Sequence, residues 1–301
     1  MESIITNESA LTLSTLKGYS ENFIDYLDVD NKTLKAYKVG IENFMDYLKE
    51  NGIKMPVRND IIAYRNHLRE TYQDNTVNSY MTALRRLFKY LKVNNLYDNL
   101  TIDIKGARYT NTPKKEVLSI DQVKNIYNSL TNDRDRALFG LMAGTGLRVC
   151  EISTALIEDL KVYNNENVLF VLGKKRDSKC EYVKISDKIL GDLKKYIGNR
   201  TSGYIFISNS NNNKNGGLSI RSLRTIIKKI FKDNGIDKDT ISCHSLRRTF
   251  ATIMYQQGKS VYDIQQVLRH ASSNTTIRYI NAITRNQNDG ETVVSNAIFG
   301  K

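Results

Sequence analysis

The sequence predicts a mainly α-helical chain of two domains, with a small β-sheet in the second. Apolar residues recur at helical spacing through most of the first hundred residues. A polar stretch around Pro113, one of only two prolines, then interrupts this pattern. Two short β-rich segments follow it, at 168–172 and 182–185. A chain of 301 residues is long enough for each domain to have its own core.

The first domain is predicted to be helical over residues 21–104. Residues 1–20 are polar and weakly patterned, so we expect an extended N-terminal lead or a short helix there. Asn31 or Thr33 is the expected cap of the first long helix. Apolar residues repeat every three or four positions in three successive helices, which predicts one buried face on each. These residues are Leu34, Tyr37, Ile41, Phe44 and Leu48; Ile61, Ile62, Tyr64 and Leu68; and Val77, Tyr80, Met81, Leu84, Leu87, Phe88 and Leu91.

The second domain is predicted over residues 116–285, after a linker at 105–115. Ser119 is expected to cap its first helix. The next helix is mostly apolar and ends in the glycine-rich turn 144–146, which places Arg148 at the start of the helix that follows. The two β-rich segments flank the sequence GKKRDSKC and therefore predict a hairpin.

Residues 286–301 are expected to form a C-terminal docking tail. Val293, Val294, Ile298 and Phe299 lie there among polar residues. Leaving these side chains in water is unfavourable, so we expect the tail to dock, with a neighbouring protomer as a candidate surface.

The charge of the chain indicates a polyanionic partner. The net charge is +13 and the isoelectric point is near 9.4. Residues 1–112 contain 15 Lys and Arg against 14 Asp and Glu, which leaves 30 against 18 for residues 113–301. The excess positive charge therefore lies in the second domain, where phosphates would have to be bound.

Other classes of protein are disfavoured by composition. No run approaches the roughly 18 apolar residues of a membrane span, and the N-terminus lacks the pattern of a secretory signal, so a cytoplasmic protein without a membrane partner is expected. The three cysteines, Cys150, Cys180 and Cys243, have neither metal-ligand spacing nor the even number of a disulfide framework. No acidic cluster suits Mg²⁺, so we expect no metal and no cofactor.

The stretch from Ser242 to Ile280 has the residues needed to act on a phosphodiester. His244 and Arg247 are three apart in a helical pattern, and His270 precedes Tyr279 by nine residues. Guanidinium groups match the charge of the non-bridging oxygens, and histidine can move protons near neutral pH. A tyrosine hydroxyl becomes a nucleophile where cations favour the phenolate and a base accepts its proton.

Three motifs in this chain resemble those of the tyrosine recombinase (phage integrase) family. The motifs are TGLRVCEI at 145–152, HSLRRTFAT at 244–252 and LRHASSNTTIRYI at 268–280. Their order and separation are far more specific than any one of them alone. The resemblance implies a helical core-binding domain joined to an α+β catalytic domain.

The resemblance also implies roles for individual residues. Arg148, Arg247, His244 and His270 would surround the scissile phosphate, with Glu151 as the buried partner of an arginine, and Tyr279 would be the nucleophile. A catalytic lysine is expected in the hairpin turn directly after Gly173. This makes Lys174 the predicted general acid, with Lys175 and Lys179 as rivals. The product would be a 3′-phosphotyrosine, formed without ATP or metal.

Further cations are predicted to contact DNA. Two departures from the family motifs, Arg248 in place of histidine and Arg269 in place of glycine, are expected to add phosphate contacts, although the lost glycine leaves the backbone before His270 undetermined. The other predicted DNA-binding residues lie on two basic helices and in the hairpin turn. They are Arg85, Arg86, Lys89, Lys92, Lys175, Arg176, Arg221, Arg224 and Lys228.

The implied function is site-specific recombination of double-stranded DNA. The resemblance implies a homo-tetramer on DNA, a Holliday-junction intermediate and exchange of C-terminal tails between protomers. The chain leaves no room for an N-terminal arm-binding domain, which favours integration and excision of a mobile element, with an accessory excision protein as a candidate partner. The alternatives are an Xer-like resolvase of chromosome dimers, a relaxing enzyme similar to type IB topoisomerases and a catalytically silent DNA-binding regulator. The DNA target depends on a few side chains that the sequence does not identify.

Overall fold

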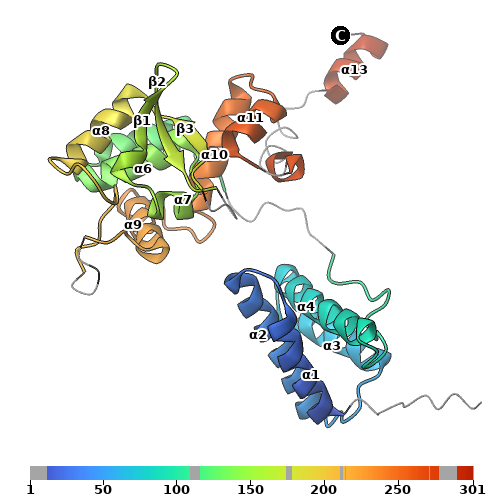
Figure 1. The fold of residues 1–301 in the computed structure, drawn as a ribbon. Helices are drawn as coiled ribbons and strands as arrows, with labels where there is room; N and C mark the ends of the chain where they lie inside the picture. The colour runs from blue at the N-terminus through green and yellow to red at the C-terminus, as the bar shows by residue number, and fades with distance from the viewer. Residues whose placement is uncertain are drawn as a thin grey trace, which may run out of the picture. The chain divides into compact units, whose positions relative to one another are not determined.

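The chain divides into two compact units, residues 1–111 and 112–301 (Figure 1). The computed structural model describes residues 12–108, 116–173, 178–210, 213, 215–270, 272–277 and 290–300. In this part of the chain, no helix is both long and apolar enough to cross a membrane.

The N-terminal unit is a bundle of four helices. Their apolar faces meet in one core, in which the rings of Phe44, Tyr64 and Phe88 contact one another at centroid distances of 4.9 and 6.5 Å. Most of the apolar positions expected in the sequence are buried, because their spacing of three and four residues places them on the inner face of each helix. The helices are α1 (Leu13–Tyr26), α2 (Asn31–Glu50), α3 (Arg58–Thr71) and α4 (Asp74–Val93).

The start of this unit differs from the prediction. The expected boundary after residue 20 falls inside α1, because Leu16 and Phe23 are both buried in the core and hold the helix to the bundle. The cap of α2 is Asp30 rather than Asn31 or Thr33. Its carboxylate accepts a hydrogen bond from the backbone N–H of Thr33 at 3.0 Å.

The C-terminal unit combines helices with a small sheet. Ser119 caps its first helix as predicted, in a capping box with Gln122. The elements are α5 (Ile120–Ser129), α6 (Asp133–Thr145), α7 (Val149–Ser153), η1 (Ile157–Asp159), β1 (Leu160–Tyr163), β2 (Glu166–Val171), β3 (Glu181–Lys184), α8 (Asp187–Ile197), α9 (Ile220–Asp233), α10 (Cys243–Gln256), α11 (Val261–Leu268) and α13 (Gly290–Phe299).

The sheet is antiparallel in the order β1-β2-β3. The predicted hairpin corresponds to β2 and β3, in which Phe170 pairs with Tyr182. Strand β1 was not predicted. Its signal was the dipeptide Asn164-Asn165, which forms the β1–β2 turn with positive φ at both residues.

Helix α10 is central to the C-terminal unit because it contacts α6, α9 and α11. Leu246 joins the main core, whereas Ala251 packs with Ile264 and Leu268 of α11 in a second cluster. The predicted fold class, mainly helical with a small sheet in the second domain, is confirmed.

Candidate active site

Arg148 is positioned by the turn that ends α6. Gly146 terminates this helix in the left-handed region, with φ of 62°. A Cβ at this position would lie 2.7 Å from the ring of Phe250 and 2.9 Å from Leu268, so both the conformation and the close approach of α10 and α11 require glycine. Arg148 follows as the N-cap of α7, where the sequence predicted it.

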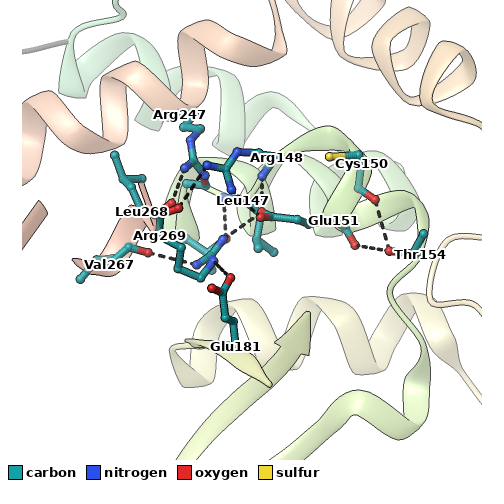
Figure 2. A network of polar contacts seen from close by, with 12 residues as sticks. Leu147, Arg148, Cys150, Glu151, Thr154, Glu181, Arg247, Val267, Leu268 and Arg269 are labelled. Carbon is teal, nitrogen blue, oxygen red and sulfur yellow. Dashed lines mark hydrogen bonds and ion pairs between the residues drawn. The ribbon is translucent and has the colours of Figure 1, made fainter. Parts of the chain in front are cut away.

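Glu151 holds Arg148 at two points. Its Oε1 is 2.8 Å from Nη1 of the arginine, and its Oε2 accepts a hydrogen bond from the Arg148 backbone N–H at 2.7 Å. Glu151 is 1% exposed, whereas the Arg148 side chain keeps 20% of its surface in contact with solvent. The geometry predicted for this pair, a buried carboxylate beside an arginine, is therefore present (Figure 2).

Arg247 lies on α10 and is 1% exposed. Its Nη1 donates to the carbonyl of Gly146 at 2.6 Å, and its Nη2 donates to the carbonyl of Leu268. The next carbonyl along the chain, that of Arg269, accepts from Nη2 of Arg148 at 3.3 Å. The carbonyls of Leu268 and Arg269, at the C-terminal end of α11, thus orient the two guanidinium groups that are predicted to bind phosphate (Figure 2).

His270 follows these carbonyls and is 7% exposed. Its Nδ1 lies 2.8 Å from the hydroxyl of Thr276, and its backbone N–H donates to the carbonyl of Gln265 at 3.1 Å. Burial, together with the nearby charges of Arg247, Arg148 and Arg269, lowers the pKa of His270 to about 3. The imidazole is therefore neutral near pH 7, with one nitrogen as a donor and the other as an acceptor.

His244 lies in the first turn of α10 and is exposed. The sequence predicted that it and Arg247 share one face of a helix. The structure places both on α10 but buries the arginine and leaves the histidine at the surface.

Arg269 stands where the family motif has glycine. Its φ of 55° and ψ of 48° lie in the left-handed region, the conformation that glycine adopts most readily. Its Nη2 is 2.8 Å from Glu151 and its Nε is 3.5 Å from Glu181. Arg248 is also buried, at 6% exposure. Both were expected to add phosphate contacts. In the structure the Arg269 guanidinium pairs with Glu151 and Glu181 and Arg248 is buried, so contact of either residue with DNA stays a prediction.

A cavity of about 1070 Å³ is lined by three of the predicted site residues described above. It brings Arg148, Arg269 and His270 together with the residues around β3 and with one face of α10 and α11. The lining residues are Gly144, Thr145, Arg148, Cys180, Glu181, Tyr182, Val183, Lys184, Phe250, Met254, Gln265, Gln266, Val267, Arg269 and His270.

Several predicted residues lie outside the described part of the chain. These are the nucleophile candidate Tyr279 and the hairpin residues Lys174, Lys175 and Arg176. The rival general acid Lys179 is described. Its ammonium group forms an ion pair with Asp159 and donates to the carbonyl of Thr154 at 3.1 Å.

The predicted DNA-binding helices have different surroundings. On α9 the side chains of Arg221, Arg224 and Lys228 are all exposed and line a shallow hollow. On α4, Lys89 and Arg86 are exposed, whereas Arg85 donates to the carbonyl of Ile104 at 2.9 Å. The remaining α4 cation, Lys92, forms an ion pair with Asp98.

Sequence reasoning missed three contributors to the site. Thr276 lies in the motif LRHASSNTTIRYI, but spacing in the sequence does not predict its hydrogen bond with His270. Glu181 had no sequence signal beyond its place at the start of a strand. The carbonyl of Gly146 was missed because a backbone acceptor has no signal in the sequence.

The buried Arg247, the partly exposed Arg148 and a neutral histidine together form a site suited to phosphodiester chemistry, in a mainly helical chain of two units. Comparison with known families identifies both units. Residues 116–285, more than half of the chain, match the phage integrase family, and residues 20–95 match the phage integrase N-terminal SAM-like domain. The chain therefore belongs to the phage integrase family of tyrosine recombinases, enzymes that cleave and rejoin DNA in site-specific recombination.

Named relatives and solved structures agree with this assignment. The chain is 28% identical to tyrosine recombinase XerA of Pyrococcus horikoshii over 270 residues, covering 88% of this chain and 89% of the relative. It is also 28% identical to tyrosine recombinase XerC of Thermodesulfovibrio yellowstonii over 290 residues, covering 87% and 90%. The fold is similar to that of XerH recombinase bound to its difH substrate, with a TM-score of 0.73, 19% identity and coverage of 95% and 86%. For the Tn1549 transposon integrase bound to transposon end DNA, the TM-score is 0.67 at 15% identity, with coverage of 92% and 98%.

Proposed function

We propose that this recombinase cleaves DNA with Tyr279 as the nucleophile while Arg148 and Arg247 bind the scissile phosphate. The observation that carries this proposal is the pair of consecutive carbonyls, of Leu268 and Arg269, that orient the two guanidinium groups. Each guanidinium has five N–H donors, so both can bind their backbone acceptors and still present donors to a phosphate oxygen. Such preorganised cations stabilise the charge that develops on phosphorus.

The two histidines would complete the phosphate site. Because His270 is neutral, it can donate one hydrogen bond to a non-bridging oxygen without adding a further charge to a cluster of arginines. His244 is at the surface of α10, where bound DNA can reach it.

The cleavage step exchanges one phosphodiester bond for another. The Tyr279 hydroxyl gives its proton to a base and its oxygen forms a bond to phosphorus; the bond to the 5′-oxygen breaks, and this oxygen takes a proton from a lysine ammonium group. The products are a 3′-phosphotyrosine and a free 5′-hydroxyl. Because the ester bond is kept, the reverse attack by a 5′-hydroxyl rejoins the strand without ATP.

Lys174 is the lysine that we assign as the general acid. Lys179, one of its rivals, forms an ion pair with Asp159 and donates to a backbone carbonyl. These contacts support a structural role for Lys179 and leave the residues directly after Gly173 as the candidates.

The direct test is the formation of a covalent adduct. Nicked duplexes tiled from the DNA that flanks the gene are incubated with the natural chain and with Tyr279→Phe, and a denaturant-resistant protein–DNA adduct is scored. We expect an adduct that forms without ATP and is lost in the variant. An adduct that persists in Tyr279→Phe would identify another nucleophile, and DNA binding without any adduct would favour a regulator.

We also propose that the active form is a tetramer on DNA, linked by exchanged C-terminal tails. The support is helix α13, on which Val293, Val294, Ile298 and Phe299 are 56% to 79% exposed. One structure similar in fold is a lambda integrase tetramer bound to a Holliday junction, with a TM-score of 0.69 at 17% identity and coverage of 91% and 78%.

The biological role that we propose is integration and excision of a mobile element. The alternative role is Xer-like resolution of chromosome dimers, and the chain is 28% identical to recombinases named XerA and XerC. The adduct assay separates the two roles by the position of the cleaved site. Cleavage at the boundary of a mobile element supports the first role, and cleavage at a single chromosomal site outside any element supports the second.

A further inference from the structure

Arg269 is in a backbone conformation that disfavours its side chain. It is the C-cap of α11 and lies in the left-handed region, where a Cβ crowds the backbone at a cost of roughly 1 kcal/mol relative to glycine. Glycine would satisfy the turn equally well, because the backbone contacts of residues 268 and 269 with Arg247 and Arg148 use carbonyl groups alone. The side chain at this position must therefore serve a different purpose.

The Arg269 guanidinium connects two elements of the catalytic unit. Nη2 binds Glu151 at 2.8 Å, and Nε lies 3.5 Å from the carboxylate of Glu181, the first residue of β3. Nη1 donates to the carbonyl of Val267 at 3.0 Å, which fixes the plane of the group. The Arg269 side chain is 7% exposed, so water screens these ion pairs only weakly.

The two glutamates belong to different parts of the proposed active site. Glu151 binds Arg148, which we assign to the scissile phosphate. Glu181 begins the strand that directly follows the hairpin loop with the proposed general acid, and it lines the same cavity. Arg269 also balances the negative charge of Glu181, which would otherwise repel a phosphate in that cavity.

We propose that Arg269 is a positioning residue that ties β3 to the Glu151–Arg148 pair, so that the general acid and the bound phosphate are held in register. This inference rests on the proposed cleavage mechanism. It assigns to Arg269 a part in protonation of the leaving oxygen, through Glu181, that a glycine cannot supply.

The experiment compares two leaving groups. One nicked duplex has the normal 5′-oxygen at the scissile phosphate, and the other has sulfur in its place. When the phosphorus–sulfur bond breaks, sulfur leaves as a stable thiolate and needs no proton, so a general acid is not required. Adduct formation is measured in single turnover for the natural chain, Arg269→Gly and Glu181→Gln. Asn164→Gly is the matched control, because it also replaces a residue of positive φ by glycine, at the other end of β2.

We expect Arg269→Gly and Glu181→Gln to slow adduct formation on the oxygen substrate by about 10- to 100-fold, less than the roughly 10²- to 10⁴-fold of a general acid itself. On the sulfur substrate both variants should react within about threefold of the natural chain. The double variant should be no slower than the slower single variant, because both changes remove the same Arg269–Glu181 ion pair. The DNA affinity of these variants should stay unchanged. Asn164→Gly should react with both substrates at the rate of the natural chain.

Two results would overturn the inference. If the variants react with the oxygen substrate as fast as the natural chain, the link that Arg269 makes between Glu151 and Glu181 is not needed for cleavage. An equal defect on both substrates would mean that Arg269 acts on the phosphate site alone. Failure of the proposed function would look different, since the natural chain itself would then give no adduct on either substrate.

Discussion

Glu151 contacts Arg148 through both of its carboxylate oxygens, one to the guanidinium at 2.8 Å and one to the backbone N–H at 2.7 Å. The second oxygen also binds Arg269. One carboxylate, 1% exposed, therefore balances two arginines and caps α7 at the same time. The proposed phosphate site depends on this carboxylate for its shape as well as for its charge.

Replacing Glu151 by alanine should destabilise the catalytic unit strongly. The change leaves two largely buried guanidinium groups without their carboxylate, and breaking a buried ion pair costs about 3–5 kcal/mol. Glu166→Ala is the control, because Glu166 pairs with Lys184 at the surface and such pairs contribute at most about 1 kcal/mol. Urea unfolding followed by circular dichroism measures both. Equal midpoints for the two variants would show that the buried pair adds no stability.

The pH dependence of stability should reveal His270. Its pKa is about 3 in the folded state and about 6.5 when unfolded. Above pH 6.5 the imidazole is neutral in both states and has no effect. As the pH falls from 6.5 toward 3, only the unfolded state gains the proton, so folding is destabilised by up to about 1.4 kcal/mol per pH unit.

The variant His270→Asn has no imidazole at this position, so it lacks this contribution of His270 to the pH dependence of stability. The natural chain should therefore lose stability faster than the variant between pH 6.5 and 4, and the difference between their urea midpoints should change steadily with pH. Carboxylates titrate in both proteins alike, so they do not affect the comparison. Parallel curves would mean that the folded protein protonates His270 as readily as the unfolded chain does.

Local spacing explains which parts of the site could be predicted. Arg148 and Glu151 are three residues apart at the start of one helix, so their contact follows from helix geometry. The contact of Arg269 with Glu151 joins residues 118 positions apart, and it depends on how α11 packs against the α6–α7 turn. Periodicity in the sequence shows that a residue lies on a helix. Which of His244 and Arg247 faces inward is decided by the neighbouring elements.

Lys174 and its rival Lys179 should respond differently to substitution. Lys174→Ala should slow cleavage by about 10²- to 10⁴-fold on the normal substrate and react almost normally on the sulfur substrate, since only the former needs a general acid. Lys179→Ala leaves Asp159 without its cation, so it should lower stability by about 1–3 kcal/mol. Its cleavage rate should change less than tenfold. If Lys179→Ala instead shows the larger defect and the sulfur rescue, Lys179 is the acid.

The exposed cations of α9 should contribute to the salt dependence of DNA binding. Each phosphate contact contributes about 0.9 to the slope of log affinity against log salt. Arg224→Ala should reduce this slope by about one and weaken binding to all sequences alike, measured by fluorescence anisotropy at several salt concentrations. Lys194→Ala, which removes an exposed cation from α8, is the control and should leave the slope unchanged. An identical slope for Arg224→Ala and the natural chain would place α9 away from the DNA backbone.

The C-terminal helix should matter for assembly and not for cleavage of a single half-site. Ile298 and Phe299 are 66% and 79% exposed on α13, and burying side chains of this size against a partner contributes about 1.5–3 kcal/mol each. The double variant Ile298→Asp, Phe299→Asp should therefore form the covalent adduct at the normal rate but fail to join two duplexes. Sedimentation velocity on DNA with paired half-sites measures the assembly. Asn296→Asp adds a negative charge to the same helix at a polar position, so it should still assemble. If the double variant forms the same multi-protomer complex as the natural chain, the tail is not the link between protomers.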